Sequence, residues 1–93
     1  MMLEQKEIQH RLSELDGWRL EGNMITRQFV FHDFREAMKF ANKTAEIAEE
    51  NDHHPDMLIS YNKVELSLTT HDEGGLTEMD FDMAEKIDRL KKA

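Results

Sequence analysis

Two short histidine-containing stretches hold most of the side chains in this chain that could do chemistry. The first is DHHPD at residues 52–56, and the second is THD at residues 70–72, so His71 follows His54 by seventeen positions. Histidine has an unperturbed pKa of about 6.5 and can both give and take protons near neutral pH. Histidines flanked by carboxylates therefore indicate proton-transfer catalysis or a metal site. The alternative is that the paired histidines only cover an exposed junction between a helix and a strand.

The composition is that of a small acidic domain. The 93 residues are 39% hydrophobic and predict one domain, residues 1–93, with one core. Twenty acidic and twelve basic side chains give a formal charge of −8, which argues against binding to nucleic acid or to an anionic membrane. The chain contains no cysteine, which excludes disulfides, thiol nucleophiles and cysteine-ligated metal.

The sequence carries no visible signal for export or membrane insertion. The first residues are charged and lack the apolar run of a signal peptide, and no stretch approaches the ~18 apolar residues of a membrane span. We therefore expect a cytoplasmic protein. A neutral or weakly charged small molecule is the ligand class that suits its charge.

The hydrophobic periodicity predicts three helices and two β-hairpins. Helices are expected at residues 4–15, at 33–50 and from Thr77 onward, and hairpins at 18–32 and 57–70, with turns at Gly22-Asn23 and Asn62-Lys63. The order α-β-β-α-β-β-α indicates an α+β fold, a four-stranded antiparallel sheet with three helices on one face. The open sheet edges and the modest apolar content favour a homo-oligomer formed by edge pairing.

The starts of the second and third helices have capping signals. Asp33 and Glu36 have the spacing of a capping box, and so do Thr77 and Asp80. Asp80 therefore has two interpretations, a helix cap and a catalytic carboxylate, which do not exclude each other. The apolar stripe of the central helix is drawn through Phe34, Ala37, Met38, Ala41, Ala45 and Ala48. Phe40 and Ile47 fall off this stripe, where they would meet a neighbouring helix or a second subunit.

Taken together, these motifs resemble the pterin-4a-carbinolamine dehydratases. The shared motifs are DHHPD at 52–56, YNKV at 61–64, TH at 70–71 and GLT at 75–77 with Asp80, and similarity extends over about residues 10–90. The resemblance implies a lyase without metal or cofactor that removes water from a 4a-hydroxytetrahydropterin, giving quinonoid dihydropterin in tetrahydrobiopterin recycling. It also implies the α+β fold and a homodimer or homotetramer. Animal members double as dimerisation cofactors of a transcription factor, so a non-catalytic interaction module is the alternative.

Carried onto this chain, the resemblance implies a catalytic set and a substrate-binding set. The catalytic set is His53, His54, His71 and Asp80, and the substrate-binding set is Glu49, Asp52, Pro55, Met57, Thr69, Thr70 and Asp72. Met57 stands where the family usually has an aromatic residue, which would make this pocket wall apolar and adaptable.

The reaction needs an acid for the leaving 4a-hydroxyl and a base for a ring N–H proton. We expect His54 to be the principal acid–base group, with His53 and His71 facing the hydroxyl and Asp80 orienting His71. The rival interpretation is a metal ion held by the three histidines and a carboxylate, because imidazole and carboxylate suit zinc or iron.

Overall fold

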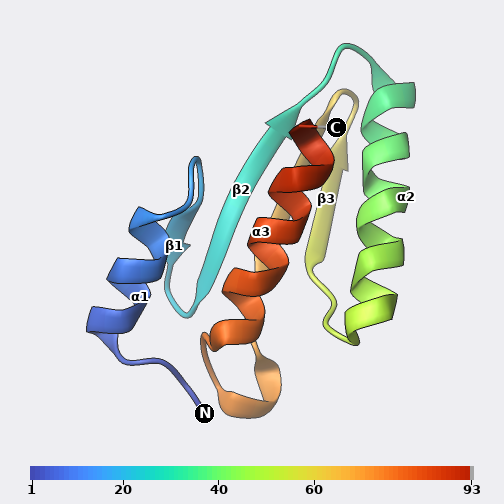
Figure 1. The fold of residues 1–93 in the computed structure, drawn as a ribbon. Helices are drawn as coiled ribbons and strands as arrows, with labels where there is room; N and C mark the ends of the chain where they lie inside the picture. The colour runs from blue at the N-terminus through green and yellow to red at the C-terminus, as the bar shows by residue number, and fades with distance from the viewer. Residues whose placement is uncertain (93) are drawn as a thin grey trace.

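All three helices lie on one face of a four-stranded antiparallel sheet (Figure 1). The protein is represented by a computed structural model that describes residues 1–92. The elements are α1 (Gln5–Ser13), β1 (Arg19–Glu21), β2 (Met24–Val30), α2 (Phe34–Asn51), β3 (Asp56–Ser60), β4 (Lys63–Leu68), a 3-10 turn (His71–Glu73) and α3 (Glu78–Lys92). The expected α-β-β-α-β-β-α order and α+β class are confirmed. Within residues 1–92, no helix combines the length and the apolar character needed to cross a membrane.

The strand order β1-β2-β4-β3 puts β1 and β3 at the edges and the core strands in the middle. Ile25 lies opposite Leu68, and Phe29 lies opposite Val64. These four side chains are buried under the helices, because alternate residues of a strand point to the same face. The second hairpin turns one residue earlier than expected, since Tyr61 takes a positive φ of 53°.

The buried side of α2 differs from the predicted stripe. Phe40 is 5% exposed and its ring lies 4.8 Å from that of Phe29, whereas Phe34 is 50% exposed. Ile47 is partly buried against the same core. The prediction that Phe40 and Ile47 fall outside the buried stripe of this helix was therefore wrong. Burying the Phe40 ring removes more apolar surface from water than burying Ala45 would, which sets the rotation of the helix.

A polar network joins the first hairpin to α3. Nε1 of Trp18 donates to both carboxylate oxygens of Asp88, at 3.0 and 3.1 Å, and Nη1 of Arg27 donates to Oδ1 at 2.9 Å. Burial raises the pKa of Asp88 above its ordinary value of 3.8, although the hydrogen bond from Trp18 and the charge of Arg27 act in the opposite direction.

We expect Asp88 to give the stability a small pH dependence of unusual sign. Because its pKa is raised, the folded protein binds more protons than the unfolded chain at pH values just above 3.8. We compare the free energy of unfolding of the parent with that of the Asp88→Asn variant at each pH. The value for the parent minus the value for the variant should fall as the pH rises through this window, and then level off. Urea titrations from pH 3.5 to 7 measure it, with Asp16→Asn as the exposed control. A difference that rises with pH would contradict this assignment.

Candidate active site

The turn that ends α2 positions the first histidine patch. Asp52 adopts a left-handed conformation, with φ 48° and ψ 43°, directly after the helix. The N–H of His53 then donates to the carbonyl of Ala48 at 3.1 Å, which fixes the direction in which the chain leaves. Pro55 disfavours a helical conformation for His54. The two histidines are thus presented by a backbone that is held at both ends.

The sheet register brings the second patch to the same end of the molecule. The first residue of β3, Asp56, lies opposite Ser67 near the end of β4. Because the two strands are antiparallel, the residues before β3 and the residues after β4 must lie close together. Beyond β4, Thr70 forms a bridge with Gly75, and the loop between them carries His71.

Asp80, on the first turn of α3, connects the two patches. Its carboxylate is fully buried, and Oδ1 lies 2.6 Å from Nε2 of His53. Oδ2 accepts the hydroxyl of Thr70 and the backbone N–H of Thr77, both at 2.9 Å. The bond to Thr77 belongs to the predicted capping box, so Asp80 both caps the helix and binds a histidine. The expected pairing of Asp80 with His71 was wrong.

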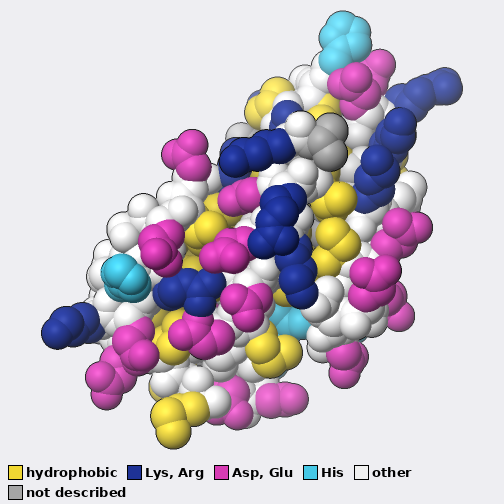
Figure 2. All heavy atoms as spheres, viewed as in Figure 1, with side chains coloured by type: hydrophobic (Ala, Val, Ile, Leu, Met, Phe, Trp, Pro, Cys, Tyr) yellow, Lys and Arg dark blue, Asp and Glu magenta, His cyan; other side chains and the backbone are white. Residues whose placement is uncertain are grey.

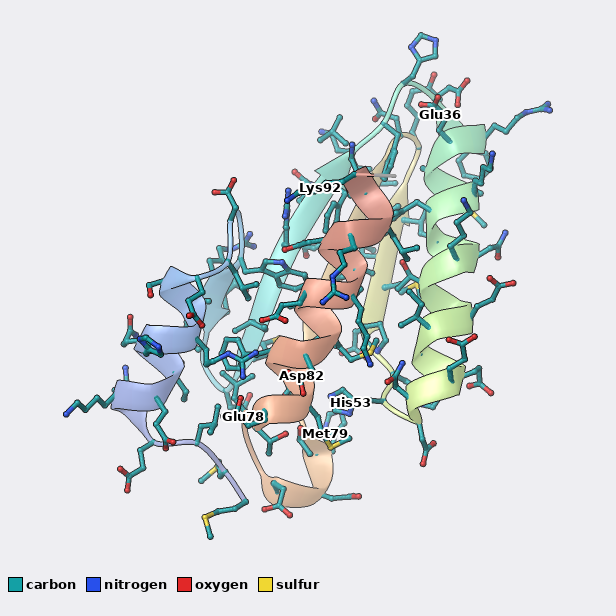
Figure 3. The ribbon with its side chains drawn as sticks, viewed as in Figure 1. Glu36, His53, Glu78, Met79, Asp82 and Lys92 are labelled. Atoms are coloured by element: carbon teal, nitrogen blue, oxygen red, sulfur yellow. The ribbon has the colours of Figure 1, made fainter. Side chains whose placement is uncertain are left out.

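The two patches open onto one cavity of about 750 Å³, within the usual range for small-molecule sites. Its lining includes seven of the residues expected from the sequence, namely Asp52, His53, His54, Thr69, Thr70, His71 and Asp72. The lining also includes Met1, Met2, Leu3, Glu7, Glu73, Thr77, Glu78 and Met79. Figure 3 shows His53 beside Met79 at the start of α3.

Three expected substrate-binding residues do not line this cavity. The Oε2 atom of Glu49 lies 2.5 Å from Nε2 of His54, and both side chains are exposed. Met57 lies opposite Leu66 and packs against the hydrophobic core. Pro55 is half-buried in the connection to β3. The position where the family usually has an aromatic residue therefore contributes to the core of this chain.

The three imidazoles have different surroundings. His53 is 8% exposed and its Nε2 atom is bound by Asp80, which leaves Nδ1 as the ring nitrogen available to a ligand. His54 and His71 are exposed at the rim. A buried histidine–carboxylate pair beside two exposed imidazoles can move protons to and from a bound molecule. Among residues 1–92, no group of three His, Cys, Asp or Glu side chains is placed to hold a metal ion.

Sequence reasoning missed the N-terminal segment and the first turn of α3. The pattern of residues 4–15 predicts which face of the helix is buried, but contains no signal for where the preceding residues run. Met79 could have been found, because it stands two positions after the cap Thr77 and one before Asp80. A residue on the first turn of α3 must lie near the groups that Asp80 contacts.

Known proteins are similar to this chain in sequence and in fold over almost its whole length. The family model described as "Pterin 4 alpha carbinolamine dehydratase" matches residues 1–90. A protein of Sulfurisphaera tokodaii, provisionally named as such a dehydratase, is 52% identical over 88 residues, which are 95% of each chain. A counterpart in Sulfolobus acidocaldarius is 46% identical over 91 residues, 98% of this chain and 100% of its own length.

A solved structure has the same fold as this chain. The crystal structure of a "transcriptional coactivator/pterin dehydratase" from Brucella melitensis matches it with a TM-score of 0.92 at 41% identity. The match covers 97% of this chain and 98% of the other. The chain therefore belongs to the pterin-4a-carbinolamine dehydratase family.

Proposed function

We propose that this chain removes water from a 4a-hydroxytetrahydropterin and releases quinonoid dihydropterin, as in tetrahydrobiopterin recycling. The observation that carries the proposal is the buried pair of His53 and Asp80, because its histidine lines the same cavity as His54 and His71. The family membership supports the substrate class, and the cavity volume suits a flat bicyclic ring.

The elimination needs two proton transfers and no change in oxidation state. The bond between C4a and the hydroxyl oxygen breaks, and an acid supplies the proton with which that oxygen leaves as water. The neighbouring ring N–H loses its proton to a base, and its electron pair forms the new C=N bond. Each transfer is a general acid–base step of the kind that histidine performs at neutral pH.

The geometry favours His53 over His54 as the principal acid. Asp80 fixes the His53 ring and stabilises the charge on it when it carries two protons, and burial strengthens both effects. His54 is 54% exposed and is bound by an exposed carboxylate, that of Glu49, so water screens its charge. We therefore assign the acceptance of the ring proton to His71, and we assign to His54 the task of holding the pterin at the rim.

Replacing His54 with alanine should reduce kcat/KM by about ten- to hundredfold, mainly through KM. The variant loses a polar contact at the rim, while the buried pair remains. Glu49→Gln should cause a smaller loss, because it only removes the charge next to His54. Steady-state kinetics on both variants measure this order. A fall in kcat for His54→Ala as large as that for a His53 variant would return the principal role to His54.

The proposal is tested with chemically prepared 4a-hydroxytetrahydropterin, whose loss is followed by absorbance against the uncatalysed rate. We expect the protein to accelerate dehydration, and to do so equally before and after treatment with a chelator. Activity that disappears with the chelator and returns with added zinc or iron would support the metal interpretation. No acceleration over the uncatalysed rate would contradict the proposed function.

A non-catalytic interaction module is the second candidate. The name of the Brucella melitensis protein includes a coactivator role, and the edge strands β1 and β3 offer places for a second copy to pair. Acidic and basic side chains lie close together over the helix-covered face (Figure 2).

We propose that the chain forms a homodimer or homotetramer, whether it is an enzyme or an interaction module. Sedimentation equilibrium measures this oligomeric state. An oligomer without dehydratase activity is the result that favours the module.

A further inference from the structure

The N-terminal segment forms a wall of the cavity that the histidine motifs do not supply. Met1, Met2 and Leu3 all line it. The N–H of Leu3 donates to the carbonyl of Leu76 at 2.8 Å, in the loop that leads into α3. Figure 1 shows the segment before α1 approaching the loop between β4 and α3. A backbone hydrogen bond thus ties this segment to the loop that carries the second histidine patch.

The side chain of Met2 lies directly on Gly75. A Cβ atom built on Gly75 would stand 2.6 Å from Sδ and 3.2 Å from Cγ of Met2, and apart from residues 74–76 it would have no other atom within 4 Å. Gly75 is buried and its φ is not in the left-handed region. The space that glycine leaves empty here is therefore the space that the Met2 thioether uses.

A cluster of charges ties α1, which follows this segment, to α3. The guanidinium of Arg11 contacts three carboxylates of α3, those of Glu78, Asp82 and Glu85. The side chain of Arg11 is only 19% exposed, and it also lies over the ring of Phe81. Figure 3 shows Glu78 and Asp82 on the first turns of α3. The helix after Met2 is thus joined to α3, whose residues Glu78 and Met79 also line the cavity.

The cavity lining lacks the usual means of holding a flat ring. No Phe, Tyr or Trp is among the lining residues within 1–92, and the large apolar side chains are three methionines and a leucine. Met57 packs into the core. A thioether makes favourable contacts with a conjugated ring and adapts to its shape. Methionines are therefore the side chains present that could cover the face of such a ring.

We propose that Met2 contacts the substrate and helps to determine specificity, by covering a face of the flat pterin ring with its thioether. This inference rests on the proposed function of the same cavity. Met2 is not an acid or a base, so it contributes to binding in the ground state and the transition state alike. Such uniform binding changes KM and leaves kcat nearly constant.

Two substitutions test the contact between Met2 and Gly75, one at each residue. Met2→Gly removes the thioether, and Gly75→Ala places a methyl group where the thioether lies. Each should raise KM by about two- to tenfold with kcat close to that of the parent, and weaken binding of 7,8-dihydrobiopterin, a stable pterin, by a similar factor. The double variant should be no worse than Met2→Gly alone, because Gly75→Ala then has nothing to displace. Gln5→Ala is the control, an exposed neighbour that does not line the cavity.

The outcomes separate this inference from the proposed function. If the parent binds pterin and dehydrates the substrate, but Met2→Gly keeps the parent KM and affinity, the inference is wrong and the proposed function stands. If Gly75→Ala is as harmful in the Met2→Gly background as in the parent, the contact with Met2 is not the reason, which also overturns the inference. If the parent neither binds 7,8-dihydrobiopterin nor dehydrates the substrate, the proposed function and the inference fail together.

Discussion

Replacing His53 with glutamine should lower kcat by about 10²–10⁴-fold in a protein that remains folded. A glutamine amide can still donate a hydrogen bond to Asp80, so the buried carboxylate keeps a partner. The amide cannot exchange a proton near neutral pH, and the acid for the leaving hydroxyl is lost. His53→Ala should lose as much activity and in addition destabilise the fold by roughly 1–3 kcal/mol, because it leaves an oxygen of Asp80 buried without a partner.

Single-turnover dehydration and thermal unfolding, measured on the same preparations, separate chemistry from stability in the His53 variants. His32→Gln is a matched control, because His32 is exposed and does not line the cavity. It should have the parent rate and the parent melting temperature. A His53→Gln variant that dehydrates within threefold of the parent would remove His53 from the mechanism.

Replacing Asp80 with asparagine should lower kcat by about 10²-fold or more, with little change in KM. Two donors, the Thr70 hydroxyl and the Thr77 N–H, already point at Oδ2, so the amide oxygen must take that side. The amide NH₂ then faces Nε2 of His53, which must become an acceptor. The neutral ring of His53 then carries its proton on Nδ1 and not on Nε2. The substitution also removes the negative charge that stabilises the doubly protonated ring.

The structural cost of Asp80→Asn should be modest, because its amide oxygen can still cap α3. Asp80→Ala should cost more, roughly 2–4 kcal/mol, because it removes the cap and leaves buried donors without a partner. Asp33→Asn is the matched control, since Asp33 caps α2 by accepting the N–H of Glu36 and has no contact with the site. It should keep full activity. An Asp80→Asn variant with the kcat of the parent would show that Asp80 is a cap and nothing more.

The sequence was sufficient to predict the fold and the meeting of the two histidine patches. Turn residues and periodicity located every α-helix and every strand to within a few residues, although not the 3-10 turn. Antiparallel pairing of two consecutive strands requires that their outer flanks meet. The start of β3 after His54 and the end of β4 before Thr70 illustrate this. Such predictions succeed because they depend on local propensity and on connections of a few residues.

The contacts that determine the role of each residue could not be predicted from the sequence. Asp80 binds His53 and not His71, which depends on the rotation of α3 relative to the turn after α2. Phe40 is buried because helix packing favoured its ring over the face drawn through Phe34. Met2 lies at the cavity because the N–H of Leu3, the next residue, donates to the carbonyl of Leu76. No spacing in the sequence indicates this contact. Each of these contacts joins residues that are distant in sequence.

The most direct test of the account is a crystal structure of the protein soaked or grown with 7,8-dihydrobiopterin. We predict that the pterin lies in the cavity between the two patches, with the ring nitrogen next to C4a about 3 Å from an imidazole nitrogen of His53 or His71. A pterin bound on another surface, or bound in the cavity with C4a turned away from His53, His54 and His71, would contradict it.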